Sequence, residues 1–130
     1  MFFDVDPSNG VPIYEQVVRQ VVYAVASEAL RAGDLVPSVR ELARELTINP
    51  NTVARAYRQL QDDGVLDSVR GTGLAISAGA LERCREARVK LIQKRLQQLL
   101  VEARQSRLDP GVFRGLIEVE LSTMHREEVE

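Results

Sequence analysis

Residues 37–60 contain two short amphipathic segments separated by three residues, and this spacing constrains the fold of the chain more than any other feature. Apolar residues recur every three or four positions in both segments, which predicts two helices that each bury one face. The helices are expected over residues 38–46 and 50–60, with a turn at 47–49. This arrangement is typical of a helix-turn-helix.

Both helices have clear start signals. Ser38 is placed to cap the first helix, and Glu41 three residues later completes a capping box. Asn49 caps the second helix, and Pro50 takes the first helical position, where a missing N–H costs nothing. The apolar stripes consist of Val39, Leu42, Ala43 and Leu46 in the first helix and Val53, Ala56, Tyr57 and Leu60 in the second.

The outer face of the second helix is polar and cationic. Asn51, Arg55 and Arg58 lie roughly opposite its apolar stripe, and Thr52 lies in the same first turns. These turns are the part of a helix-turn-helix that enters the major groove of DNA, where arginine pairs with guanine and asparagine with adenine. Considered alone, the face fits a solvated helical hairpin equally well.

A glycine-bearing hairpin follows the second helix. Strands are expected at 65–69 and 74–77, around a basic turn at 70–73. Gly71 and Gly73 allow positive φ at the tip, and Arg70 is placed to reach a phosphate or the minor groove. Any hairpin tip tolerates arginine and glycine, but a helix-turn-helix followed by such a hairpin is more specific, and it predicts a winged helix.

The order and spacing of these residues resemble the GntR family of bacterial transcription regulators, and within it the short YtrA-like subfamily. The resemblance covers about the first 77 residues and is carried by 12–16, 33–34, 37–43, 48–53, 56–57, 60, 64 and 70–73. It implies a winged helix that binds an operator. One departure is Glu28, which stands where a glycine usually ends the family's first helix.

The candidate DNA-contacting residues lie at the start of the first helix of the motif, on its second helix and at the hairpin tip. They are Ser38, Arg40, Asn49, Asn51, Thr52, Arg55, Arg58, Arg70, Gly71 and Thr72. The winged helix is expected to have a core of its own, formed by Val17, Val21, Val25, Leu42, Leu46, Val53, Leu60 and Leu66.

The C-terminal part of the chain predicts a helical hairpin. Residues 80–107 lack glycine and proline and are expected to form one long helix, and Asp109 and Pro110 mark the start of a last helix. The apolar stripes are too extensive for one hairpin to cover, so we expect a homodimer, as the YtrA-like resemblance also implies. The candidate dimerisation residues are Val89, Ile92, Leu96, Leu99, Phe113, Leu116 and Ile117.

Charge and hydropathy bear on the partners and the location. The chain has a net charge of −2, and residues 1–79 contain seven arginines, no lysine and ten acidic residues. Non-specific affinity for DNA should therefore be modest, and the doubled contacts of a dimer should matter. No apolar run approaches the ~18 residues of a membrane span, and the N-terminus lacks a signal-peptide pattern, so we expect a cytoplasmic protein without membrane contact.

Few residues suggest other chemistry. Cys84 is expected to be a small buried residue, the alternative being a redox-sensing thiol activated by neighbouring arginines. The basic run within 83–95 is interpreted as a solvated helix face, with an extra DNA contact as the alternative. His125 has no partner at metal-ligand spacing, and no phosphate loop or nucleophile motif occurs. We expect neither enzyme activity nor a metal or other cofactor.

The sequence therefore predicts a mainly α protein with a small β-hairpin. An N-terminal winged helix-turn-helix DNA-binding domain is expected over 1–78, and a two-helix dimerisation tail over 79–130. The expected function is that of a homodimeric repressor with a pseudo-palindromic double-stranded operator, and the resemblance adds control of a neighbouring transporter operon. The effector ligand stays unknown.

Two alternatives to this function remain. The first is the front of an aminotransferase-like regulator of the same family, against which the short tail argues because it offers no large domain for a pyridoxal cofactor. The second is a winged-helix protein-interaction module without DNA binding, which the acidic balance of the chain favours.

Overall fold

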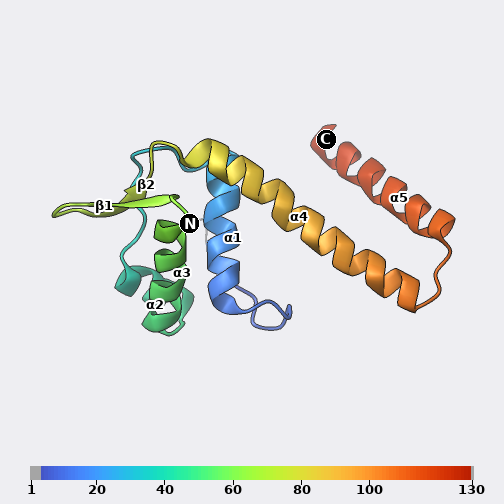
Figure 1. The fold of residues 1–130 in the computed structure, drawn as a ribbon, viewed down its shortest axis with the longest axis horizontal. Helices are drawn as coiled ribbons and strands as arrows, with labels where there is room; N and C mark the ends of the chain where they lie inside the picture. Colours follow the sequence, from blue (N-terminus) through green and yellow to red (C-terminus); the bar gives the residue numbers. More distant parts are fainter. Residues whose placement is uncertain (1–3, 130) are drawn as a thin grey trace. The chain divides into compact units, whose positions relative to one another are not determined.

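The structure, a computed structural model, describes residues 4–129 and contains five helices and a two-stranded antiparallel sheet (Figure 1). The elements are α1 (Ile13–Ala26), α2 (Val39–Leu46), α3 (Pro50–Asp62), β1 (Leu66–Val69), β2 (Gly73–Ile76), α4 (Ala80–Gln105) and α5 (Pro110–Val129). The chain divides into two compact units, Met1–Lys90 and Leu91–Glu130. The predicted fold class, mainly α with a small β-hairpin, is confirmed.

The core of the first unit lies where α3 packs against both α1 and α2 (Figure 1). Seven of the eight predicted core residues are at most 1% exposed: Val17, Val21, Val25, Leu42, Val53, Leu60 and Leu66. The prediction is wrong for Leu46, which is only half-buried. It is the last residue of α2, where the chain turns away from the core.

The Ser38 and Asn49 side chains cap α2 and α3 as the sequence indicates, and of the predicted capping box the bond that Ser38 accepts is formed. The Ser38 Oγ accepts a hydrogen bond from the Glu41 N–H (3.1 Å), and the Asn49 Oδ1 accepts one from the Asn51 N–H (2.8 Å). Pro50 is the first residue of α3. These local bonds satisfy amide groups that a helix N-terminus otherwise leaves without partners.

The turn between α2 and α3 contains a strained residue. Thr47 has a φ of 56°, in the left-handed region that glycine adopts most easily. The Ile48 N–H donates to the Ala43 carbonyl (3.0 Å), and the Thr47 N–H donates to the Arg44 carbonyl (3.3 Å). These two bonds are those of the loop that commonly ends a helix with glycine at the left-handed position.

The hairpin has the predicted position and a tight tip. β1 and β2 pair antiparallel, from Leu66 opposite Ile76 to Val69 opposite Gly73. At the tip, the residue after Gly71 donates its N–H to the Val69 carbonyl (3.0 Å), and Gly71 has a φ of 78°. The backbone conformation at the tip therefore favours glycine.

The sequence did not predict a third extended segment on this sheet. Leu35 forms an isolated bridge with Ala75, and the Val36 N–H donates to the Leu74 carbonyl (3.0 Å). The segment before α2 is therefore tied to the hairpin, although 40 positions separate Leu35 from Ala75.

The start of α4 belongs to the first unit. Ala80 and Cys84 are fully buried, so the first turns of α4 complete the core. The expected domain boundary between 78 and 79 falls at the beginning of this helix, whereas the first compact unit continues to Lys90. Burial raises the pKa of the Cys84 thiol to about 11, which favours the packing role over the redox alternative.

The second unit is a helical hairpin formed by the rest of α4 and by α5. The Asp109 Oδ2 accepts hydrogen bonds from the Gly111 and Val112 N–H groups (3.0 and 3.3 Å), at the predicted start of the last helix. A groove of about 490 Å³ runs between the helices, lined by Leu99, Glu102, Ala103, Ser106, Leu108, Phe113, Leu116, Ile117, Glu120, Leu121 and Met124. Its lining is mainly apolar.

None of the helices in residues 4–129 combines the length and the apolar character that crossing a membrane requires. No three His, Cys, Asp or Glu side chains gather in this range where they could hold a metal ion.

Candidate nucleic-acid interface

The outer face of α3 is accessible. Asn51, Arg55 and Arg58 are exposed, and Thr52 is half-buried. The opposite face of the helix is buried, with every member of the predicted stripe at most 2% exposed. The Asn49 Oδ1 is used as the helix cap, which leaves the amide nitrogen of that side chain for an external acceptor.

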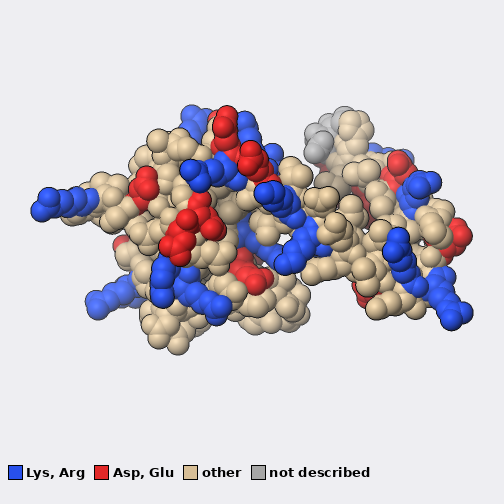
Figure 2. Space-filling model, viewed as in Figure 1, with Lys and Arg blue, Asp and Glu red and all other residues tan. Residues whose placement is uncertain are grey.

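The other predicted DNA-contacting residues are also exposed. They are Ser38 and Arg40 at the start of α2, and Arg70, Gly71 and Thr72 at the hairpin tip. On the face drawn in Figure 2, basic side chains project from the hairpin tip, and others lie beside α2. The structure therefore brings all ten candidates into one compact unit, and their contact with DNA stays a prediction.

Tyr57 connects α3 to the segment that enters α2. Its side chain is 2% exposed, and its hydroxyl donates to the Pro37 carbonyl (2.8 Å). Burial raises the pKa of this hydroxyl, and the carboxylates of Glu41 and Glu45 act in the same direction. Tyr57 therefore remains a neutral donor that fixes the start of α2 relative to α3.

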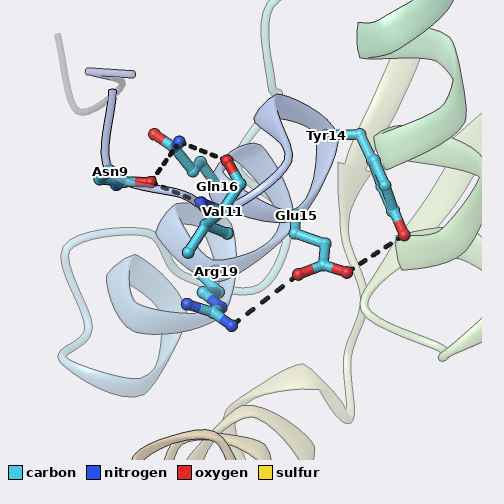
Figure 3. Close-up of polar contacts among 6 residues, drawn as sticks. All are labelled: Asn9, Val11, Tyr14, Glu15, Gln16 and Arg19. Carbon is cyan, nitrogen blue, oxygen red and sulfur yellow. Dashed lines mark hydrogen bonds and ion pairs between the residues drawn. The ribbon is translucent and has the colours of Figure 1, made fainter. Parts of the chain in front are cut away.

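One contact of the interface is not evident from the sequence. The guanidinium carbon of Arg55 lies 3.7 Å from the centroid of the Tyr14 ring, which comes from α1. The Tyr14 hydroxyl donates to the Glu15 Oε1 (3.2 Å), and the Glu15 carboxylate pairs with Arg19 (3.8 Å; Figure 3). In the sequence, Tyr14 stands out only as a member of the family-like segment 12–16.

Gln16 organises the segment before α1. It is 6% exposed, and its Nε2 donates to the Asn9 Oδ1 (3.0 Å) and the Val11 carbonyl (2.9 Å), as Figure 3 shows. The same nitrogen also donates to the Asp6 carbonyl (2.8 Å). The Gln16 Oε1 accepts from the Asp6 N–H (2.8 Å). Hydrogen bonds from Ser8 lower the pKa of the Asp6 carboxyl. A buried, fully bonded side chain thus fixes a loop that has no periodic pattern.

Two arginines of the basic run in α4 have contacts within the first unit. The Arg85 Nε donates to the Ala26 carbonyl (3.4 Å), and its guanidinium pairs with Glu28 (3.9 Å). The Arg83 guanidinium lies against Gly64, which follows α3. Cations at these positions stabilise the C-terminal ends of α1 and α3, where the helix dipole is negative. Arg83 and Arg85 therefore contribute to packing, a role that is neither the predicted solvated face nor the alternative of an extra DNA contact.

Known proteins are similar to this chain in both sequence and fold. Residues 13–76 match the family described as "Bacterial regulatory proteins, gntR family". The HTH-type transcriptional repressor YtrA of Bacillus subtilis (strain 168) is 38% identical over 99 residues, which are 76% of this chain and 76% of that protein. Its similarity to this chain therefore extends beyond the winged helix.

Two solved structures are similar over most of the chain. One is a GntR family transcriptional regulator from Listeria monocytogenes, which is 30% identical with a TM-score of 0.67, over 89% of this chain and 97% of that chain. The other is YtrA from Sulfolobus acidocaldarius, described as a GntR-family transcription factor. It is 28% identical with a TM-score of 0.58, over 75% of this chain and 99% of that chain.

Proposed function

The chain belongs to the gntR family of bacterial regulatory proteins and is YtrA-like. We propose that it is a homodimeric transcriptional repressor that binds a pseudo-palindromic DNA operator. The observation that carries the proposal is the exposed, cationic outer face of α3, beside an accessible hairpin in the same compact unit.

In this proposal, α3 is the recognition helix that enters the major groove of DNA. Arg55 donates two hydrogen bonds to a guanine in the major groove, and Asn51 pairs with an adenine. Thr52 meets a phosphate or a thymine methyl group. The hairpin tip adds Arg70, which reaches a phosphate or the minor groove next to the recognition helix. Base contacts then provide the sequence preference, and phosphate contacts hold the orientation.

The charge of the chain supports binding as a dimer. Residues 1–79 carry seven arginines against ten acidic residues, so one winged helix offers few cations to the phosphates. Each phosphate contact contributes separately to affinity and to its salt dependence. Two linked winged helices double the contacts, and joining two binding events raises the overall affinity by orders of magnitude. The half-sites should then lie about one helical turn apart.

The tail provides apolar surface for the dimer. Val89, Ile92, Leu96 and Leu99 follow alternating spacings of three and four along α4 and are 48–63% exposed. On α5, Leu116 is 54% exposed, while Phe113 and Ile117 are half-buried beside the apolar groove. Isolated exposed apolar residues are common, but a continuous series on two helices is typical of an interface. A second copy of the tail is the proposed occupant.

For the regulated genes and the cellular location, the proposal rests on the family resemblance alone. YtrA of Bacillus subtilis is named a repressor, and for this chain we propose repression of a neighbouring transporter operon. A protein whose partner is bacterial operator DNA acts in the cytoplasm. The proposal includes no enzymatic step, in line with relatives that are regulators.

Fluorescence anisotropy with labelled DNA from upstream of its own gene tests the proposal. We expect saturable binding that weakens steeply with salt and resists competition by unrelated DNA. Arg55→Ala should weaken binding by about 1–3 kcal/mol. Arg31→Ala is the control, because Arg31 is an exposed arginine in the loop after α1 and outside the candidate set.

The alternative function gives a different result in the same assay. A winged-helix module that binds only proteins shows no salt-sensitive, sequence-selective binding to this DNA. If Arg55→Ala and Arg31→Ala reduce affinity equally, Arg55 acts only through its charge, and its assignment as a base-reading residue is wrong.

A further inference from the structure

Arg55 is the exposed arginine of α3 that stacks on an aromatic ring. Its guanidinium carbon lies 3.7 Å from the centroid of the Tyr14 ring, and the two residues come from different helices. Arg58, one turn further along the same helix, is exposed and has no such aromatic contact in the described part of the chain. The contact therefore distinguishes one arginine of the candidate interface from its neighbour.

From this contact we propose that Tyr14 is a positioning residue, which holds Arg55 in the conformation that reads a base pair. This inference rests on the proposed function, because it assigns a role to Tyr14 in DNA recognition. Tyr14 itself touches no base. It acts by reducing the number of conformations that the long Arg55 side chain explores before DNA arrives.

The geometry of stacking leaves Arg55 free to bind. An aromatic ring contacts the flat face of a guanidinium, whereas all five N–H donors point outward in the guanidinium plane. The guanine O6 and N7 accept hydrogen bonds in that plane. Arg55 can therefore keep its contact with Tyr14 while it bonds to a guanine.

The Tyr14 ring is itself held in place. It is half-buried, and its hydroxyl donates to the Glu15 Oε1 (3.2 Å), whose carboxylate also pairs with Arg19 (3.8 Å; Figure 3). α1 and α3 pack against each other in the core of the first unit. The Tyr14 ring is thus held in a fixed position relative to α3, which carries Arg55, although 41 positions separate Tyr14 from Arg55 in the sequence.

The test compares base preference and affinity in a double-mutant cycle. An operator is selected from a random DNA pool with the full wild-type chain, and each of its base pairs is then varied. Tyr14→Leu should weaken binding about 3- to 10-fold and lose preference at the base pair where Arg55→Ala also loses it. Tyr14→Phe keeps the ring and should stay within about 2-fold of wild type.

The combined variants separate positioning from a general structural effect. Tyr14→Leu should have little further effect in an Arg55→Ala background, whereas its effect should be retained in full in an Arg58→Ala background. If Tyr14→Leu weakens binding equally in both backgrounds, or leaves base preference unchanged, the inference is overturned. If the wild-type chain selects no sequence at all, the proposed function itself fails.

A measurement on the wild type keeps the inference testable if Tyr14→Leu does not fold. Protons of the Arg55 side chain above the Tyr14 ring should have NMR signals shifted by the ring current. The shift should persist when the selected operator is added, because Arg55 stays stacked. If the shift disappears on binding, Arg55 leaves the ring to reach DNA, and Tyr14 does not position it.

Discussion

Replacing Tyr57 with phenylalanine should destabilise the protein, whereas the same replacement at Tyr23 should not. Both hydroxyls are buried, and both changes remove a single oxygen atom. The Tyr57 hydroxyl donates to the Pro37 carbonyl at 2.8 Å. The Tyr23 hydroxyl is buried without a hydrogen-bond partner. The pair therefore separates the contribution of a hydrogen bond from that of burial.

The magnitudes follow from what each hydroxyl loses. A hydrogen bond contributes about 1 kcal/mol net, and more when the remaining partner is left buried and unsatisfied. Pro37 and Tyr57 line an open groove of about 580 Å³, so water can reach the freed carbonyl and limit the loss. We expect Tyr57→Phe to lower the free energy of unfolding by about 1–2 kcal/mol. Tyr23→Phe should leave it unchanged or raise it by up to about 1 kcal/mol.

Urea unfolding followed by circular dichroism measures the difference. All proteins are compared at one concentration, because the proposed dimerisation would make the apparent stability depend on protein concentration. A difference of about 2 kcal/mol between the two variants should separate their urea midpoints by about 1 M, since the free energy of unfolding of a small protein falls by about 1–3 kcal/mol per molar urea. Equal midpoints for the two variants would refute the role assigned to the Tyr57 hydroxyl.

Four further predictions concern separate parts of the chain. Arg70→Ala should weaken operator binding evenly across sequences and reduce the slope of log affinity against log salt by about 1 per protomer; a loss confined to one base pair would contradict this. Thr47→Gly should raise the free energy of unfolding by about 0.5–1 kcal/mol, because it relieves the strain of a φ of 56°; urea unfolding checks it. Burial raises the pKa of the Cys84 thiol from 9.0 to about 11, so the folded chain holds this proton more tightly than the unfolded chain. The free energy of unfolding should therefore fall as the pH rises between these two values, and Cys84→Ala should reduce that fall. Leu96→Glu should shift the protein from dimer to monomer in sedimentation, whereas Gln97→Glu, at an exposed position away from the stripe, should not.

Local signals account for what the sequence predicted well. Ser38, Asn49 and Asp109 cap helices at the expected positions, because a cap depends on residues only two or three positions apart. The apolar stripe of α3 is buried throughout, since the helical period alone decides which side chains share a face. The hairpin follows from glycines at its tip and apolar residues beside them.

Contacts between distant segments could not be predicted in the same way. The bridge from Leu35 to Ala75, the stacking of Arg55 on Tyr14 and the four hydrogen bonds of Gln16 depend on tertiary packing. No periodicity or spacing encodes them. The start of α4 was assigned to the tail for a related reason. Its residues read as an ordinary helix, and only the folded chain shows that the first turns complete the core.

These contacts change how the dimer should be tested. A fragment meant to contain the winged helix alone should end at Lys90, where the first compact unit ends, because a fragment that stops before α4 loses the buried residues Ala80 and Cys84. Such a fragment should be monomeric and should bind a single half-site weakly. Equal operator affinity of the fragment and the full chain would show that the tail does not increase binding by dimerisation.

Whether the chain binds an operator as a dimer can be measured by selection from a random DNA pool. The full chain is used, and the protein-to-DNA ratio in the selected complex is then determined. We expect enrichment of one pseudo-palindromic sequence, with half-sites about one helical turn apart and two protomers bound to each duplex. A pool that stays unenriched after repeated rounds, or an enriched single motif bound by one protomer, would contradict dimeric binding to an operator.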